Sequence, residues 1–181
     1  MHSLTFRRAL PSDGPVIVAL VTSAYRGEAS RQGWTTEADL IGGQRIDLQV
    51  LTHDIRRPDS VVLLAERGSE LIGCAHVARS EANHAYFGMF AVRPTGQSRG
   101  DGSAILAEAE RFAAQEWATQ VMTMTVLDAR AELLAFYERR GYRRTGRYRP
   151  FPYGDTRFGL PIRDDLRLEV LDKALAAGQL P

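Results

Sequence analysis

One feature of the sequence limits the possible folds most. It is an apolar stretch that runs through a glycine-punctuated loop straight into an expected alanine-rich helix. Residues 86–103 read YFGMFAVRPTGQSRGDGS. At the start of a helix several backbone N–H groups lack intrahelical partners and the helix dipole is positive, so the main chain alone can bind a pyrophosphate. The segment therefore predicts a strand, an anion-binding loop and a helix in direct succession.

The two glycines next to the expected helix have a specific use in such a loop. A side chain at Gly100 or Gly102 would stand between the backbone amides and the phosphate oxygens. Arg99 adds positive charge, and Ser103 places a hydroxyl where it can cap the helix or contact an oxygen. A tight turn followed by an amphipathic helix would explain the same glycines by backbone geometry alone.

The spacing of the loop excludes two common nucleotide sites. The loop has no Gly-Lys-Ser/Thr ending, which a nucleoside-triphosphate P-loop requires. Its pattern is Gln97-x-x-Gly100-x-Gly102 instead of Gly-x-Gly-x-x-Gly, and it lies in the middle of the chain. A dinucleotide site in an opening βαβ unit is therefore not expected.

At these residues the chain resembles the GNAT (GCN5-related) N-acetyltransferase superfamily, whose acetyl-CoA loop has the form Gln/Arg-x-x-Gly-x-Gly/Ala after a strand ending in Val-x-Pro. The resemblance implies that acetyl-CoA serves as the acyl donor and that two central strands splay apart to expose backbone groups to it. The residues it assigns to the donor are Phe90, Ala91, Val92, Gln97, Ser98, Arg99, Gly100, Asp101, Gly102 and Ser103. The side chains of Phe90 and Val92 are expected in the core.

A second resemblance lies in residues 130–142, RAELLAFYERRGY, where apolar residues recur at helical spacing before Gly141. The family has a Phe-Tyr-x-x-x-Gly-Phe/Tyr signature here, and it implies that Tyr137 protonates the departing CoA thiolate. A phenol suits this role because it stays protonated at neutral pH. Alternatively, Tyr137 anchors the helix in the core. Arg130 replaces the usual Asn and is expected to be a solvated charge, the alternative being a CoA phosphate contact.

Composition indicates one globular domain over residues 1–181, since 25% of the residues are charged and 44% are apolar. No apolar run is long enough for a bilayer, and the N-terminus lacks the layout of a signal peptide, so a cytoplasmic protein without membrane contacts is expected. The single cysteine, Cys74, is expected to be buried, and no metal site is predicted. A net charge of +1 gives no indication of nucleic-acid binding.

The pattern of elements predicts an α+β fold, an α/β sandwich with a mixed central sheet of about seven strands flanked by about four helices. Strands are expected near 4–9, 61–66, 71–78, 85–92, 121–127, from 142 onward and at 166–171, where the last strand closes the sheet. Helices are expected near 13–25, 103–118 and 130–141. This is the GNAT order, so the resemblance covers nearly the whole chain. It also admits a homodimer.

Two loops are expected to wall the acceptor site. Residues 25–40 contain Trp34, Thr35 and Glu37, which we predict as substrate contacts and, for Glu37, as the general base; a helix cap at Thr35 or Thr36 is the alternative. Residues 149–161 form a long loop rich in proline, glycine and aromatics, and such loops are usually functional or disordered.

The reaction implied is acetyl transfer to a primary amine by direct attack in a ternary complex, with a small molecule or a peptide as the acceptor. The usual base on the strand before the loop is missing, which leaves Glu37, Glu81, His84, His76 or a water relay. Arginines at 26, 31, 149 and 157 favour an acceptor that carries a carboxylate. The alternatives are an acyl-CoA-binding sensor with little turnover and a transferase that uses another acyl donor.

Overall fold

The computed structural model describes residues 3–33, 35–81, 83–96 and 100–176. The predictions for Trp34, Gln97, Ser98 and Arg99 therefore lie outside the described residues. None of the helices in the described part of the chain is both long and apolar enough to cross a membrane.

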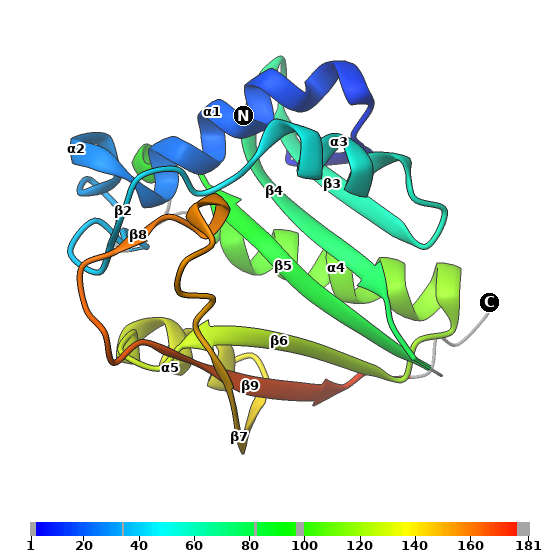
Figure 1. Ribbon diagram of the computed structural model, residues 1–181. Coiled ribbons are helices and arrows are strands. Elements are labelled where there is room, and N and C mark those ends of the chain that lie inside the picture. The colour runs from blue at the N-terminus through cyan, green and yellow to red at the C-terminus, as the bar shows by residue number, and fades with distance from the viewer. Residues whose placement is uncertain (1–2, 34, 82, 97–99, 177–181) are drawn as a thin grey trace.

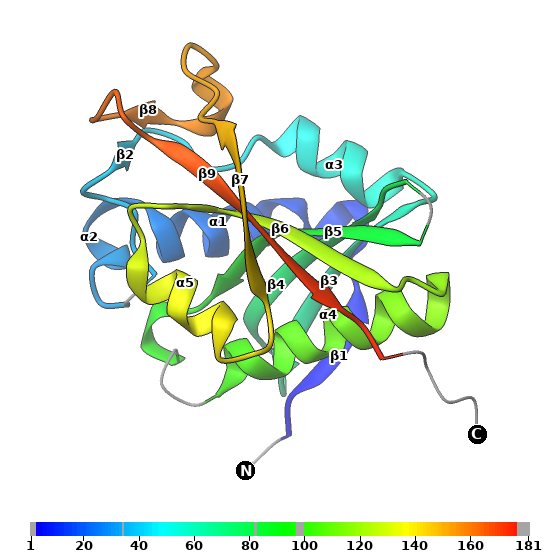
Figure 2. The same ribbon diagram turned by 90° about the horizontal axis from the view of Figure 1, so that it is seen from below.

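Seven strands form one mixed sheet in the order β1-β3-β4-β5-β6-β9-β7, which confirms the predicted architecture (Figures 1 and 2). Neighbouring strands are antiparallel except β5 and β6, which run parallel. The strands are β1 (Thr5–Arg8), β3 (Ser60–Arg67), β4 (Glu70–Arg79), β5 (His84–Val92), β6 (Val121–Leu127), β7 (Arg143–Pro150) and β9 (Arg167–Ala174).

The last strand does not take the place that the sequence predicts. β9 was expected to close the sheet, but it pairs with β6 on one side and with β7 on the other, so β7 is the edge strand. The chain thus forms the edge strand β7 first, and β9 then pairs between β7 and β6.

Helices cover both faces of the sheet (Figure 1). On one face lie α1 (Gly14–Tyr25) and α3 (Leu48–Arg56), and on the other α4 (Asp101–Trp117) and α5 (Ala131–Glu138). Side chains of a strand alternate between faces, so Leu63 packs with the α4 and α5 core whereas Leu64 packs with the α1 core. Cys74 is fully buried in the second core, as expected.

The parallel pair β5 and β6 separates along its length, as Figure 1 shows. The two strands are paired only between His84–Tyr86 and Val121–Thr123. Beyond Tyr86 they diverge, which confirms the predicted splay and begins it four residues before Phe90. The gap opens between the two helical layers, beside the start of α4.

The two loops that were expected to wall an acceptor site are joined to each other. Strand β2 (Ile41–Gly42) pairs antiparallel with β8 (Leu160–Pro161), and Figure 2 shows them side by side. The short helices α2 (Gly27–Ser30), η1 (Pro11–Asp13), η2 (Pro94–Gly96) and η3 (Thr156–Phe158) complete the described elements. No helix follows Thr35 or Thr36, but Thr36 caps a single turn, since its hydroxyl accepts from the N–H of Ala38 at 3.2 Å. In that turn the carbonyl of Glu37 accepts from the N–H groups of Leu40 and Ile41 at 2.8 and 2.9 Å.

Candidate active site

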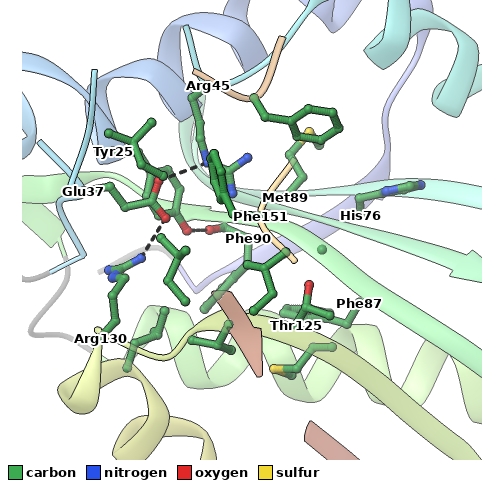
Figure 3. A pocket seen from close by; sticks show the side chains of 18 of the residues that line it. Tyr25, Glu37, Arg45, His76, Phe87, Met89, Phe90, Thr125, Arg130 and Phe151 are labelled. Atoms are coloured by element: carbon green, nitrogen blue, oxygen red, sulfur yellow. Dashed lines mark hydrogen bonds and ion pairs between the residues drawn. The ribbon is translucent and has the colours of Figure 1, made fainter. Parts of the chain in front are cut away.

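A cavity of about 300 Å³ lies where β5 and β6 separate (Figure 3). Its walls come from β4, β5 and β6, from the end of α1, from α5, and from both joined loops. Of the predicted catalytic residues, both Tyr137 and Glu37 line it. Much of the wall is apolar, formed by Ile41, Phe87, Met89, Phe90, Met124, Val126, Leu127, Leu133, Phe151, Phe158 and Leu168.

A bulge in β5 turns the backbone toward this cavity. Cys74 on β4 pairs with Ala91 and His76 pairs with Gly88, so one residue of β4 faces two of β5, Met89 and Phe90. Met89 has a φ of 42°, which is unusual for a residue with a side chain. The backbone of these two residues therefore leaves the ladder at the widening gap.

The hydroxyl of Tyr25, at the end of α1, donates a hydrogen bond to the carbonyl of Phe90. This bond fixes the bulge from the acceptor side of the cavity. Ala91 and Val92 remain paired with β4, opposite Cys74 and Gly73. The side chains of Phe90 and Val92 lie in the core, as predicted.

Tyr137 reaches the cavity from α5 and is only 4% exposed. Its ring contacts those of Phe136 and Tyr142 edge to face, at 5.3 and 5.8 Å between centres. Burial raises the pKa of Tyr137 well above the ordinary value for a phenol, so the hydroxyl keeps its proton. Its hydroxyl makes no hydrogen bond to any described residue, so the O–H is available to a ligand. The ring of Tyr137 thus packs in the core while the residue also lines the cavity.

Glu37 lies at one end of the cavity among three guanidinium groups (Figure 3). Its Oε2 is 2.6 Å from Nη1 of Arg26 and 3.4 Å from Nε of Arg45, and its Oε1 is 3.1 Å from Nη1 of Arg130. Arg45 also lies over the ring of Tyr25, 5.0 Å from its centre. Among the described residues that line the cavity, Glu37 is the only carboxylate.

These contacts revise the predicted base role of Glu37. Burial by itself raises the pKa of Glu37, but the attraction of Arg45, Arg130 and Arg26 outweighs burial and lowers the pKa below its ordinary value. Both carboxylate oxygens are already engaged. A carboxylate with such low proton affinity is a poor proton acceptor, and its observed role is to hold the three arginines together.

Two further predictions for this end of the cavity are corrected. Arg130 is not a solvated charge: it is buried, and its Nη2 donates to the carbonyl of Thr35 at 2.6 Å. Thr35 itself does not line the cavity, because its side chain is buried and its hydroxyl donates to the carbonyl of Ala24 at 3.4 Å. Both residues hold the acceptor loop against α1 and α5.

The remaining candidates for the general base differ in whether they line the cavity. Glu81 and His84 are exposed and do not line the cavity. His76 does line it, and its Nε2 lies 2.7 Å from the hydroxyl of Ser60. Burial lowers the pKa of His76, so its ring is a weaker base than a free imidazole.

The start of α4 has the properties expected of a phosphate site. Ser103 and Ala104 donate to the carbonyl of Gly100 at 3.0 and 3.1 Å, so the N–H groups of Asp101 and Gly102 precede the first intrahelical bond. Gly100 has a φ of +83°, and a Cβ built on it meets nothing within 4 Å. The space beside Gly100 is therefore open among the described residues.

Gly102 and Asp101 also have contacts that serve the fold. A Cβ on Gly102 would lie 3.3 Å from Cζ of Phe90 and 3.6 Å from Cγ2 of Val92, so the absence of a side chain lets α4 pack on β5. Asp101 is buried, and its Oδ1 lies 2.6 Å from Nη2 of Arg67.

Arg140 supplies a cation beside the start of α4, as expected of the basic cluster from Arg139 to Arg149 near phosphates. Its Nε donates to the hydroxyl of Ser103 at 3.0 Å, and its guanidinium lies 3.5 Å from the centre of the Phe136 ring. A half-buried positive charge thus lies beside the open N-terminus of α4, which fits a ligand that carries a pyrophosphate. Within the described residues, no group of three or more histidine, cysteine, aspartate or glutamate side chains is arranged to hold a metal ion.

Comparisons with known proteins agree with this geometry. A family model described as "Acetyltransferase (GNAT) family" matches residues 23–142. No curated protein sequence matches the chain.

Three solved structures illustrate the likeness in fold. The ribosomal-protein-S18-alanine N-acetyltransferase from Escherichia coli has a TM-score of 0.70 and 14% identity, over 99% of both chains. The ribosomal-protein-alanine N-acetyltransferase from Brucella melitensis has a TM-score of 0.69 and 20% identity, over 94% of this chain and 99% of that one. The PaiA N-acetyltransferase from Thermoplasma acidophilum, solved with coenzyme A, has a TM-score of 0.64 and 16% identity, over 95% and 99%.

The family match covers the splayed strands, the start of α4 and the helix that carries Tyr137. The chain therefore belongs to the acetyltransferase (GNAT) family.

Proposed function

We propose that the protein transfers an acetyl group from acetyl-CoA to a primary amine. The observation that carries the proposal is the hydroxyl of Tyr137, which keeps its proton and faces the cavity at the gap between β5 and β6. The three structural neighbours described above are named as N-acetyltransferases, which supports the same reaction class for this protein.

The donor would be held from the side of α4. The free N–H groups at Asp101 and Gly102, together with Arg140 and Ser103, suit its pyrophosphate. The gap that opens beyond Tyr86 leads from there to the cavity. The thioester supplies an activated acetyl group, and the bulge at Met89 and Phe90 offers backbone groups near it.

In the proposed reaction the amine nitrogen forms a bond to the thioester carbon, and the carbon–sulfur bond breaks. Tyr137 donates its proton to the sulfur, the new amide nitrogen releases its extra proton to solvent, and Tyr137 regains one from solvent. The acceptor ammonium must first lose a proton. The cavity wall holds three guanidinium groups and one carboxylate, and this excess of positive charge favours the uncharged form of the acceptor amine. We therefore assign the proton to water in the cavity.

The test is a calorimetric titration with acetyl-CoA, paired with free-thiol release over a panel of amines, amino acids and peptides. Binding with amine-dependent thiol release would support the proposal. Binding without release on any amine would favour an acyl-CoA sensor or another acyl donor. Absence of binding would contradict the assignment of the donor site.

A further inference from the structure

The arginine cluster at the end of the cavity has more positive charge than the protein compensates. Arg26, Arg45 and Arg130 face one carboxylate, Glu37, whose side chain is 7% exposed. Among the described residues lining the cavity, no aspartate or second glutamate adds negative charge. Buried charge is costly unless it is paired and hydrogen-bonded, so the cluster is suited to an anion from outside the chain.

The three arginines differ in what they leave unused. Arg130 is engaged by both Glu37 and the Thr35 carbonyl. Arg26 is 6% exposed and bonds through Nη1 to Glu37, while its buried Nε and Nη2 have no hydrogen-bond partner in the described part of the chain. The cluster therefore contains unsatisfied donors at its centre as well as excess charge.

Arg45 is the arginine that a ligand can reach. Its only polar contact with a described residue is the 3.4 Å approach of Nε to Glu37, and its side chain is 29% exposed. Neither terminal nitrogen makes a hydrogen bond to a described residue. Figure 3 shows its side chain entering the pocket on the opposite side from Arg130, with Glu37 between them. Stacking on Tyr25 fixes the plane of the guanidinium.

We propose that the acceptor amine also carries a carboxylate, which binds the two terminal nitrogens of Arg45. This inference rests on the proposed function and names its substrate class. Two parallel N–H donors of a guanidinium match the two oxygens of a carboxylate. Met89 and Phe151 also line the pocket, and the rest of its wall is largely apolar (Figure 3). The acceptor is thus a free amino acid or a similar amine with an apolar body.

The same charges disfavour other amines. A polyamine would bring a second cation to a wall that already holds three guanidinium groups. The N-terminus of a peptide has an amide in place of the carboxylate, so it would leave the donors of Arg45 unpaired. A free amino acid satisfies them and still presents its amine to the gap.

The test compares three matched acceptors: an apolar amino acid such as phenylalanine, its carboxamide, and the amine that lacks the carboxyl group. The expected kcat/KM of thiol release is about 10- to 100-fold higher for the amino acid, the range of one charge-assisted contact. Arg45→Gln should abolish this preference, so that the amino acid and its carboxamide react with a similar kcat/KM. Arg45→Lys should restore part of it.

The control is Arg31→Gln. Arg31 directly follows α2, pairs with Glu28 and Asp39 at the surface, and does not line the cavity. This variant should keep the wild-type preference. Calorimetry of the wild-type protein with the N-acetyl amino acid and its N-acetyl carboxamide gives a readout that requires neither turnover nor a folded variant.

A preference for the carboxamide or the simple amine would overturn the inference and leave the transferase proposal standing. Preference for the carboxylate that persists in Arg45→Gln would also overturn it. If no amine releases thiol but the wild-type protein binds the N-acetyl amino acid selectively, and Arg45→Gln removes that binding, the anion site holds and the proposed transfer fails.

Discussion

Arg130 donates to the carboxylate of Glu37 at 3.1 Å across 93 residues of sequence, and both side chains are buried. The bond joins the N-terminus of α5, the helix that carries Tyr137, to the loop that walls the acceptor end of the cavity. The wall of the site therefore depends on one carboxylate shared by three arginines.

Replacing Glu37 with glutamine should destabilise the protein strongly. The change leaves three buried guanidinium groups without their counter-charge, and breaking such a pair costs about 3–5 kcal/mol. Chemical denaturation at neutral pH measures the free energy of unfolding. Glu81→Gln, at an exposed position, is the control and should be neutral. If Glu37 were a general base without a structural role, Glu37→Gln would instead be stable and inactive.

Acidification should remove the same stabilisation. Because the pKa of Glu37 is lower in the folded protein than in the unfolded chain, its contribution is present at neutral pH and is lost as the pH falls through the folded-state pKa. The difference in unfolding free energy between wild type and Glu37→Gln should therefore shrink toward acid. A difference that stays constant on acidification would contradict the ion-pair role.

Tyr137→Phe should spare acetyl-CoA binding and reduce turnover by about 100-fold, the scale of general acid catalysis. The ring stays packed against Phe136 and Tyr142, so only the proton donor is lost. Calorimetry and saturating-substrate kinetics measure the two effects. Tyr148→Phe, exposed on β7, is the matched control. Lost affinity with a retained rate would refute the acid role.

Local patterns predicted most of the fold because the signals themselves are local. Apolar runs bounded by turn residues located β3, β4, β5 and β6 to within a residue or two, and Gly141, with a φ of +90°, follows the end of α5 as its position predicts. Helix α3 was missed although its start is signalled in sequence: the side chain of Asp47 accepts from the N–H groups of Gln49 and Val50 at 2.9 and 3.0 Å.

The site was harder to predict because its members are distant in sequence. In sequence, Glu37 and Asp39 follow two threonines, a pattern that is typical of a helix start. Nothing in the sequence near Glu37 indicates that it will contact Arg130, 93 residues away. Arg45 follows a two-residue strand with no motif around it, and its importance appears only once β2 and β8 pair. The order of β7 and β9 is likewise set by long-range pairing, since β9 lies between β6 and β7.

The two glycines at the start of α4 should respond differently to substitution. Gly100→Ala forces a residue with a side chain to a φ of +83° in open space, which costs about 1–2 kcal/mol of stability without a steric clash. Gly102→Leu must push against Phe90 and Val92, so it should separate α4 from β5 and abolish acetyl-CoA binding as well. Calorimetry and thermal unfolding distinguish the two. Unchanged acetyl-CoA affinity in Gly102→Leu would contradict the described packing.

Gly159 should set the position of the second acceptor loop. A Cβ there would lie 2.5 Å from Cγ2 of Ile41 and 2.8 Å from the carbonyl oxygen of Gly42, so alanine must separate β8 from β2 and displace Phe158 at the cavity wall. We expect a several-fold rise in KM for the acceptor and an unchanged dissociation constant for acetyl-CoA.

Gly154→Ala is the matched control for that variant. Gly154 has a φ of +88° against +99° for Gly159, but a Cβ on it meets nothing within 4 Å. Both variants therefore place a side chain at a positive φ, at a cost of order 1–3 kcal/mol, and at Gly159 the ψ of −176° lies in a region almost confined to glycine. Only Gly159→Ala adds a clash with β2. An equal rise in acceptor KM in both would mean that backbone strain in the loop, and not its contact with β2, shapes the acceptor wall. A rise confined to Gly159→Ala would show that the β2–β8 contact holds that wall in place.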